Sequence, residues 1–190
     1  LPSHINDPKS FAWKPLVMWD ALNRLKVGAM IYLDAGVELV RYPGWMVELM
    51  EKRGYVYVAQ EGRHTGGLCC GPLGELTFDA TFRYLGLNKA DYADKLMSAG
   101  GIQAYREVQP DEGGQVVDAI NLVLRPVAEC GWDINCMAPP GSSLDNHRQD
   151  QSVFSIFVHK SGLNVETDYA FWGNGRSLFE MKTPAEYERA

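Results

Sequence analysis

The chain has 190 residues, of which 46% are hydrophobic and 22% charged, a composition that is typical of a folded globular protein and excludes a disordered chain. Its formal net charge is −6 without any block of basic residues, so nucleic acid is not an expected partner. No stretch approaches the roughly 20 apolar residues that span a bilayer, and no signal peptide opens the chain, so we expect membrane attachment only through a segment outside it.

Helical and strand patterns alternate along the first third of the chain. Pro15 can occupy the first turn of a helix whose apolar residues recur with a period near 3.6, ahead of Gly28. The apolar run over 29–34 predicts a strand, 45–53 a helix closed by glycine, and 55–59 a second strand. This alternation is typical of β-α-β units, and it predicts an α/β fold with a mostly parallel central sheet and helices on both faces.

Longer irregular segments follow. Residues 61–75 are rich in glycine and lack periodicity, which predicts a long loop. We expect helices over 77–85, 90–97 and 115–129, and a strand over 101–106. Because the sequence contains no repeat, low-complexity tract or linker, we expect one domain spanning 1–190.

A carboxylate ends the first predicted strand. Ligands of open α/β sheets bind beyond the carboxyl ends of the strands, so Asp34 is placed for a ligand. In an extended chain Asp34, Gly36 and Glu38 share one face, and two carboxylates flanking a small residue suit a hard divalent cation that carries phosphates. The alternative is a strand-terminal aspartate that only makes a turn.

The polar run DNHRQDQS opens directly onto an apolar helical pattern. A helix N-terminus presents unpaired N–H groups that suit phosphate or carboxylate ligands, and Asp150 there can act as a general base or help to hold a cation. The alternative is a simple N-cap formed by Asp145 or Asn146, with His147 and Arg148 solvated.

Three basic side chains are candidates for binding phosphate. Lys14 lies between Trp13 and Pro15, whose rigid geometry fixes its direction, although it can instead extend to solvent beside a core tryptophan. Arg63 and His64 lie in the glycine-rich loop, where they can meet an acceptor sugar or a diphosphate or have no role.

Four segments together resemble a known group of proteins. FAWKP (11–15), IYLDAG (31–36), CMAP (136–139) and HRQDQS (147–152) occur in this order and spacing in glycosyltransferase-like proteins with the GT-A nucleotide-diphospho-sugar transferase fold. The resemblance spans roughly 8–165 and includes families with a D-A-G triplet in place of D-x-D. It implies a Rossmann-related fold whose first strands precede this chain, so we expect an N-terminally truncated domain.

The resemblance implies transfer of a sugar from a nucleotide-sugar donor to a glycan, protein or other hydroxyl acceptor. Members commonly bind a divalent cation (Mn²⁺ or Mg²⁺) on the donor diphosphate through D-x-D, and the resemblance carries that role to Asp34. Glycine at position 36 removes the second carboxylate, which puts metal dependence in question. We expect the following roles: Asp150 and Arg148 in catalysis; Lys14, Asp34, Ala35, Gly36, Arg63, His64 and Gln151 in donor binding; Asp34, Glu38 and His147 as metal ligands.

The cysteines bear on the compartment. Cys130 and Cys136 are close enough in sequence for a small disulfide loop, which would indicate an oxidising compartment such as the Golgi lumen or secretory pathway. Two buried free thiols are the alternative, with a cytoplasmic location.

Two functions from different classes remain open. One is an active glycosyltransferase. The other is an inactive relative that keeps the fold and binds a nucleotide-sugar or a glycan, which the glycine at position 36 and the expected truncation favour. A glycoside hydrolase is a weaker third hypothesis, because no second carboxylate is evidently paired with Asp150.

Overall fold

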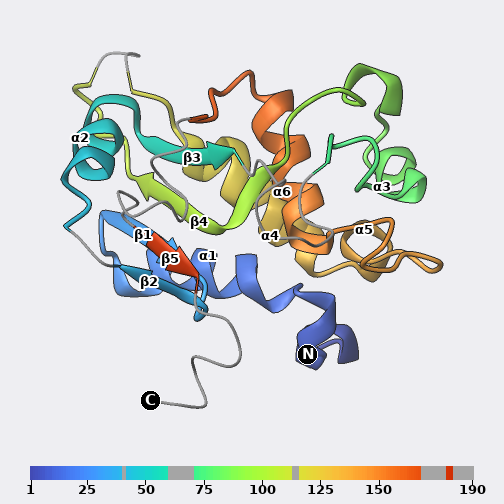
Figure 1. Cartoon of the computed structure of the whole chain (residues 1–190). Helices are drawn as coiled ribbons and strands as arrows, with labels where there is room; N and C mark the ends of the chain where they lie inside the picture. The colour runs from blue at the N-terminus through green and yellow to red at the C-terminus, as the bar shows by residue number, and fades with distance from the viewer. Residues whose placement is uncertain (40–41, 60–70, 113–115, 168–178, 182–190) are drawn as a thin grey trace.

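The fold is built around a three-stranded antiparallel sheet, shown in Figure 1. The computed structural model describes residues 1–39, 42–59, 71–112, 116–167 and 179–181. The central strand is β4 (Ser98–Arg106), which pairs antiparallel with β1 (Ala29–Leu33) on one side and with β3 (Tyr55–Ala59) on the other. The α/β class is confirmed, whereas the expectation of a mostly parallel sheet is wrong.

Burial of both faces of the sheet explains the error. In β3, Tyr55 and Tyr57 enter one hydrophobic cluster, while Val56 and Val58 enter another on the opposite face. A strand covered on both faces has a continuous apolar sequence, which is the pattern commonly found in parallel sheets. Here helices cover both faces of an antiparallel sheet, so the same apolar pattern arises without parallel pairing.

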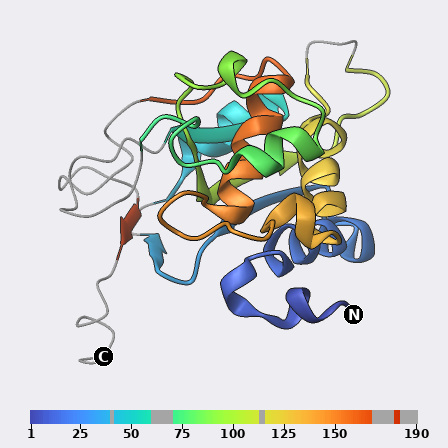
Figure 2. The ribbon, with the colours of Figure 1, turned by 90° about the vertical axis from the view of Figure 1, so that its right-hand side faces the viewer.

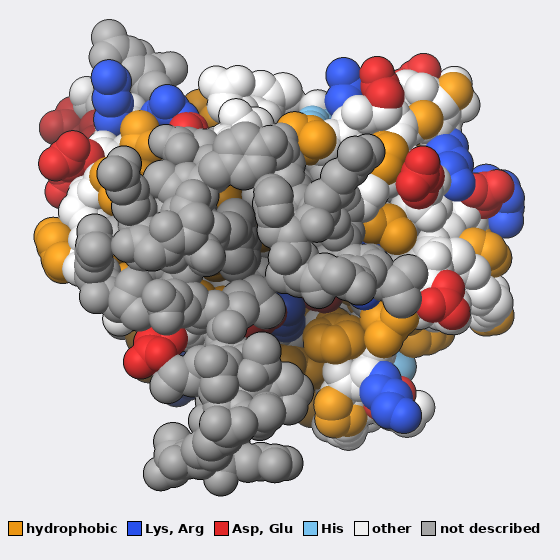
Figure 3. Space-filling model, viewed as in Figure 1, with side chains coloured by type: hydrophobic (Ala, Val, Ile, Leu, Met, Phe, Trp, Pro, Cys, Tyr) orange, Lys and Arg blue, Asp and Glu red, His pale blue; other side chains and the backbone are white. Residues whose placement is uncertain are grey.

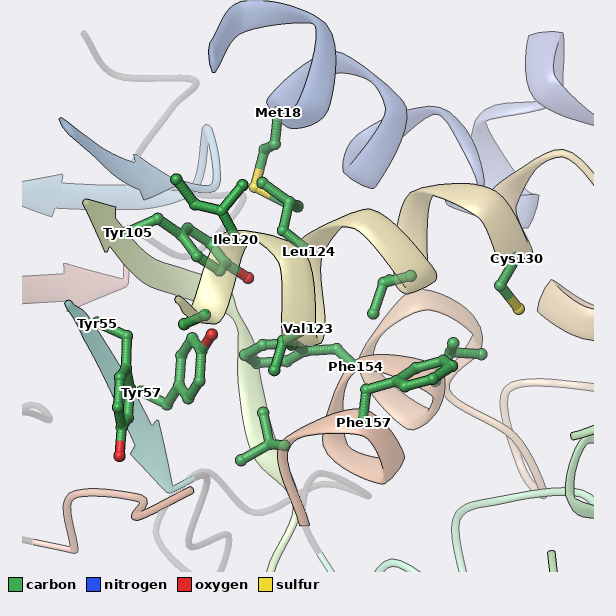
Figure 4. Close-up of a cluster of buried hydrophobic side chains, with 14 of the residues drawn as sticks. Met18, Tyr55, Tyr57, Tyr105, Ile120, Val123, Leu124, Cys130, Phe154 and Phe157 are labelled. Carbon is green, nitrogen blue, oxygen red and sulfur yellow. The ribbon is translucent and has the colours of Figure 1, made fainter. Parts of the chain in front are cut away.

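The helices divide between the two faces. The face that carries Tyr55 and Tyr57 packs against α1 (Trp13–Leu25), α4 (Arg125–Gly131) and α6 (Gln149–Lys160). In Figure 4 the rings of Tyr57, Tyr105 and Phe154 meet in this cluster, with Tyr57 edge-on to the other two. The opposite face packs against α2 (Gly44–Arg53). The sheet is therefore the middle layer between two helical layers.

Shorter elements complete the described part of the chain. The helix expected over 77–85 is confirmed in its centre, whereas the segment 90–97, also expected to be helical, contains only part of one 3-10 turn. The helix expected over 115–129 begins with a π-helical turn. A second small sheet pairs β2 with β5, and Figure 2 shows it apart from the main sheet. The bounds are η1 (Ser3–Asn6), η2 (Pro8–Ser10), β2 (Val37–Leu39), α3 (Asp79–Tyr84), η3 (Lys89–Asp91), η4 (Ile120–Leu124), α5 (Ile134–Met137) and β5 (Phe179–Met181).

Glycine ends α2 as expected. Gly54 has a φ of 90°, and its N–H donates to the carbonyl oxygen of Met50. A Cβ at this position would lie 2.2 Å from the carbonyl oxygen of Val117. Both the left-handed backbone and the close approach of a neighbouring chain segment therefore require glycine.

The described surface shows no extended field of one charge sign in the view of Figure 3, where acidic and basic side chains lie interspersed along the edge. None of the described helices combines the length and the apolar composition needed to cross a membrane.

The disulfide prediction is confirmed. Cys130 and Cys136 are bonded with a Cα–Cα distance of 5.3 Å, which joins the end of α4 to α5. The next residue, Met137, accepts a hydrogen bond from His147 through its carbonyl oxygen. The disulfide thus restrains the segment to which the start of α6 is attached.

Removing this disulfide should destabilise the protein moderately. For so short a loop, the change Cys130→Ala with Cys136→Ala should lower the free energy of unfolding by about 2 kcal/mol, because the unfolded chain regains loop entropy. Urea unfolding followed by circular dichroism measures this change. The control is the reduced wild type, which lacks the disulfide but keeps both cysteine side chains. An unchanged unfolding midpoint in both samples would show that the bridge does not restrain the chain.

Candidate functional site

Three charged side chains from distant parts of the sequence meet at one point. Nζ of Lys14 lies 3.1 Å from Oδ1 of Asp34 and 3.0 Å from Oδ2 of Asp150. They come from the first turn of α1, the residue after β1 and the first turn of α6. Asp34 and Asp150 therefore line one cleft although they are far apart in sequence, and we call Lys14, Asp34 and Asp150 the ionic triad.

Neighbouring groups on the sheet hold Asp34. The hydroxyl of Tyr32 donates to Oδ1 of Asp34 at 2.7 Å, and the N–H of Asp34 donates to the carbonyl oxygen of Gly101 at 2.9 Å. A Cβ on Gly101 would lie 2.7 Å from Oδ2 of Asp34. The lack of a side chain on β4 therefore makes room for this carboxylate.

The start of α6 is fixed by contacts other than the side-chain cap considered as an alternative. Arg148 occupies the N-cap without a capping side chain, and its N–H lies within hydrogen-bonding distance of both the carbonyl oxygen of Leu76 and Oγ of Ser152. The Gln151 amide donates to the carbonyl oxygen of Ser98, the first residue of β4. The alternative prediction of an N-cap formed by Asp145 or Asn146 is therefore wrong, and tertiary contacts position Asp150.

Burial and the neighbouring charges set the protonation of the ionic triad. Burial raises the pKa of Asp150 to about 6, although the charge of Lys14 opposes this rise. Burial alone would lower the pKa of Lys14, but Asp150 and Asp34 outweigh it and the net change is upward. Burial and the bond to Asp34 raise the pKa of Tyr32, which keeps its proton as a donor. At neutral pH Lys14 is therefore charged and most of Asp150 is ionised.

The ionic triad borders a cavity of about 160 Å³. The Asp34 side chain is 40% exposed and the Asp150 side chain 8%, so Asp34 lies nearer the surface. Gly100 and Gly101 of β4 line the cavity, and a Cβ on Gly100 would lie 3.1 Å from the side chain of Gln151. The space therefore exists because this part of β4 has no side chains, and its lining includes the charged groups of the ionic triad.

The other expected site residues fall into three groups. Arg148 and Gln151 line the same cavity as the ionic triad. Ala35 and Glu38 are exposed, and a Cβ on Gly36 would meet nothing within 4 Å. Arg63 and His64 lie outside the described residues.

His147 is buried away from solvent and is bonded to the backbone through both ring nitrogens. Nδ1 accepts from the N–H of Phe78 at 3.4 Å, and Nε2 lies 2.9 Å from the carbonyl oxygen of Met137. Burial lowers the pKa of His147 to about 4, so the ring is neutral. The side chain of His147 therefore has a structural role, because its hydrogen bond to Met137 connects the segment before α6 to α5.

The described residues contain no group of three or more His, Cys, Asp or Glu side chains that could hold a metal ion. Asp34, Glu38 and His147 are therefore not brought together as a ligand set. Lys14 instead places a positive charge directly beside Asp34.

Sequence reasoning missed Tyr32, Gly100 and Gly101. Tyr32 lies two positions before Asp34 on the same strand, so period-two alternation would have placed both on one face. A glycine at the start of a predicted strand, preceded by another glycine, also indicates a close approach by another group. Both signals were present in the sequence.

Comparison with known proteins adds no assignment: no protein-family model, curated protein or solved structure matches this chain.

Charge changes in the ionic triad should shift the pKa of Asp150 in opposite directions. Asp34→Asn should lower the pKa of Asp150, because a repelling negative charge is lost and Lys14 then pairs with Asp150 alone. Lys14→Met should raise it, because the compensating ammonium is lost. Carboxyl ¹³C NMR titration measures both, with Asp145→Asn on the exposed loop as the control. Shifts in the same direction would contradict the described charge arrangement.

The buried histidine should make stability depend on pH. Because the folded pKa of His147 is about 4 and its ordinary value is 6.5, its contribution is present above pH 6.5 and is lost as the pH falls through about 4. The free energy of unfolding of the wild type relative to His147→Gln should fall by about 3 kcal/mol across this window. Urea unfolding at several pH values tests this, with His159→Gln on α6 as the control. A difference that does not vary with pH would contradict the prediction.

Proposed function

We propose that this chain is a glycosyltransferase domain that moves a sugar from a nucleotide-diphosphate donor to an acceptor hydroxyl, with Asp150 as general base. The observation that carries the proposal is the environment of the Asp150 carboxyl group, which lines a cavity. Burial raises its pKa to about 6, and Nζ of Lys14 lies 3.0 Å from its Oδ2. A general base is most effective when its pKa lies near the working pH. The resemblance of four sequence segments to GT-A enzymes supplies the reaction class.

In the proposed step, written for an inverting enzyme, the acceptor hydroxyl enters the cavity and donates a hydrogen bond to Asp150. Its oxygen forms the new bond to the anomeric carbon, its proton passes to Asp150, and the nucleotide diphosphate leaves with the electron pair of the broken bond. Lys14 opposes the effect of burial and so keeps more of Asp150 ionised before the step. A retaining mechanism would give Asp150 another role.

The donor would lie on the Asp34 side of the cavity. Asp34 is the more exposed carboxylate, and the open space at Gly36 lets a ligand approach the backbone closely. Arg148 and the start of α6 would stabilise negative charge on the leaving group, with Gln151 as a further polar contact. A divalent cation, where the donor brings one, would neutralise the diphosphate, but the described residues do not form an ion site and no step relies on it.

A second candidate is an inactive domain that binds a nucleotide-sugar or a glycan. The observation that favours it is that the charged groups of the ionic triad already pair with one another. Lys14 contacts both carboxylates, and Asp34 also accepts the hydrogen bond of Tyr32, so these carboxylates have partners without any reaction. Such a site can bind hydroxyl groups without transferring a proton.

Activity should require ionised Asp150. With a panel of nucleotide-sugars and free sugars as acceptors, kcat/KM should rise with pH through about 6 and then level off, because the proton must first leave Asp150. Asp150→Asn should lower kcat by roughly 10²–10⁴-fold, the usual contribution of a general base. Released nucleotide and transferred sugar are measured together, so that donor hydrolysis is distinguished from transfer.

Asp145→Asn serves as the matched control, because it removes a carboxylate from an exposed loop near the start of α6. Each assay is run with Mn²⁺ and with a chelator, which separates a cation from Lys14 and Arg148 as the source of positive charge. Donor binding by calorimetry without turnover at any pH would support the binding domain and overturn the transferase.

A further inference from the structure

A second cavity of about 580 Å³ lies beside the ionic triad. One wall is the N-terminal segment with η1 and η2, and the other is the loop that precedes α6; Figure 2 shows these two segments next to each other. Phe11, Leu144 and Gln149 line both this cavity and the smaller one. The two cavities therefore share a boundary formed by these three residues.

Two of these boundary residues have an unusual backbone. Phe11 has a φ of 53° and Gln149 a φ of 38°, and both lie in the left-handed region that non-glycine residues rarely adopt. Among the described residues the other such case is Lys26, which caps the end of α1, just as Phe11 caps the end of η2. Left-handed non-glycine residues are strained and are found more often at ligand sites than elsewhere. Their backbone conformations fix two of the three residues that the cavities share.

The volumes indicate how a ligand would use the two cavities. Sites for small molecules usually measure about 300–1,000 Å³. The cavity at the ionic triad, at about 160 Å³, is smaller than this, whereas the second cavity, at about 580 Å³, lies within it. A ligand that is buried to the usual extent must therefore extend from Asp150 across the boundary.

We propose that the second cavity is an acceptor subsite that takes a second sugar ring, so that the acceptor is a glycan of at least two units. This inference rests on the proposed function. The reacting hydroxyl lies at Asp150, and the next ring passes Phe11 and Leu144 into the second cavity.

The lining of the second cavity matches the two kinds of surface on a sugar ring. Phe11 and Leu144, which is 52% exposed, offer apolar contact to the C–H face of the ring at the boundary. Asp7, Lys9 and Ser142 offer polar groups to hydroxyls on the ring edge.

A peptide acceptor fits this lining less well. Extended peptides are often bound by pairing with the edge of a sheet. The walls of the second cavity are 3-10 turns, the short helix α5 and a loop, and none of its lining residues lies in a described strand.

The test fills the second cavity from each wall. Ser142→Trp does so from the loop and Lys9→Trp from the N-terminal segment, and neither residue lines the cavity at Asp150. Lys52→Trp, on the exposed side of α2, is the matched control for adding tryptophan. Methyl hexosides and the corresponding disaccharide methyl glycosides serve as acceptors.

The wild type should use disaccharides with a kcat/KM at least tenfold above that for monosaccharides. Each filling variant should remove this preference by raising the KM for disaccharides, with little change for monosaccharides. Equal kcat/KM for both acceptor lengths in the wild type would overturn the subsite while leaving the transferase standing, as would a preference for a serine peptide over both sugars.

Saturation-transfer NMR with the disaccharides alone separates the two proposals. Signals from both rings that lose the second ring in Ser142→Trp, without turnover in any assay, would support the subsite and overturn the transferase. Absence of binding together with absence of turnover would overturn both.

Discussion

The contact of one buried ammonium with two carboxylates is the constraint on which the arrangement of the site depends. Lys14 is 5% exposed, and removing one partner from such a buried pair usually costs about 3–5 kcal/mol because the remaining charge has lost its compensation. The contact holds the start of α1, the end of β1 and the start of α6 in one geometry. The placement of Asp150 at the cavity therefore depends on how α1, β1 and α6 are packed relative to one another.

Local signals were sufficient where local physics decides the structure. The helix that ends at Gly54 and the strand Tyr55–Ala59 follow from periodicity and from a glycine with left-handed backbone, and the disulfide follows from a short spacing. Strand direction did not follow, because β1, β3 and β4 pair across long stretches of sequence. Burial of both faces then produced the apolar pattern of a parallel strand in an antiparallel sheet.

The candidate site shows the same division. Lys14, Asp34 and Asp150 were identified from their positions beside predicted elements, and the structure brings them together. His147 shows what residue type cannot reveal: a histidine in a polar run is compatible with a metal ligand or with a ring bonded to backbone, and only tertiary contacts distinguish the two. The space at Gly101 likewise depends on an approach between segments far apart in sequence.

Places where the chain departs from local preferences are concentrated around the cavity. Phe11 and Gln149 adopt left-handed backbone without glycine, α6 begins without a capping side chain, and a lysine is buried with two acids. Each departure costs stability, so packing elsewhere must offset it. The sheet covered on both faces provides that packing, because its two hydrophobic clusters bury both faces of β4 and one of them includes the apolar side of α6. A strained polar cleft on such a scaffold is what preorganised binding or catalysis requires, since the groups then need no rearrangement when the ligand arrives.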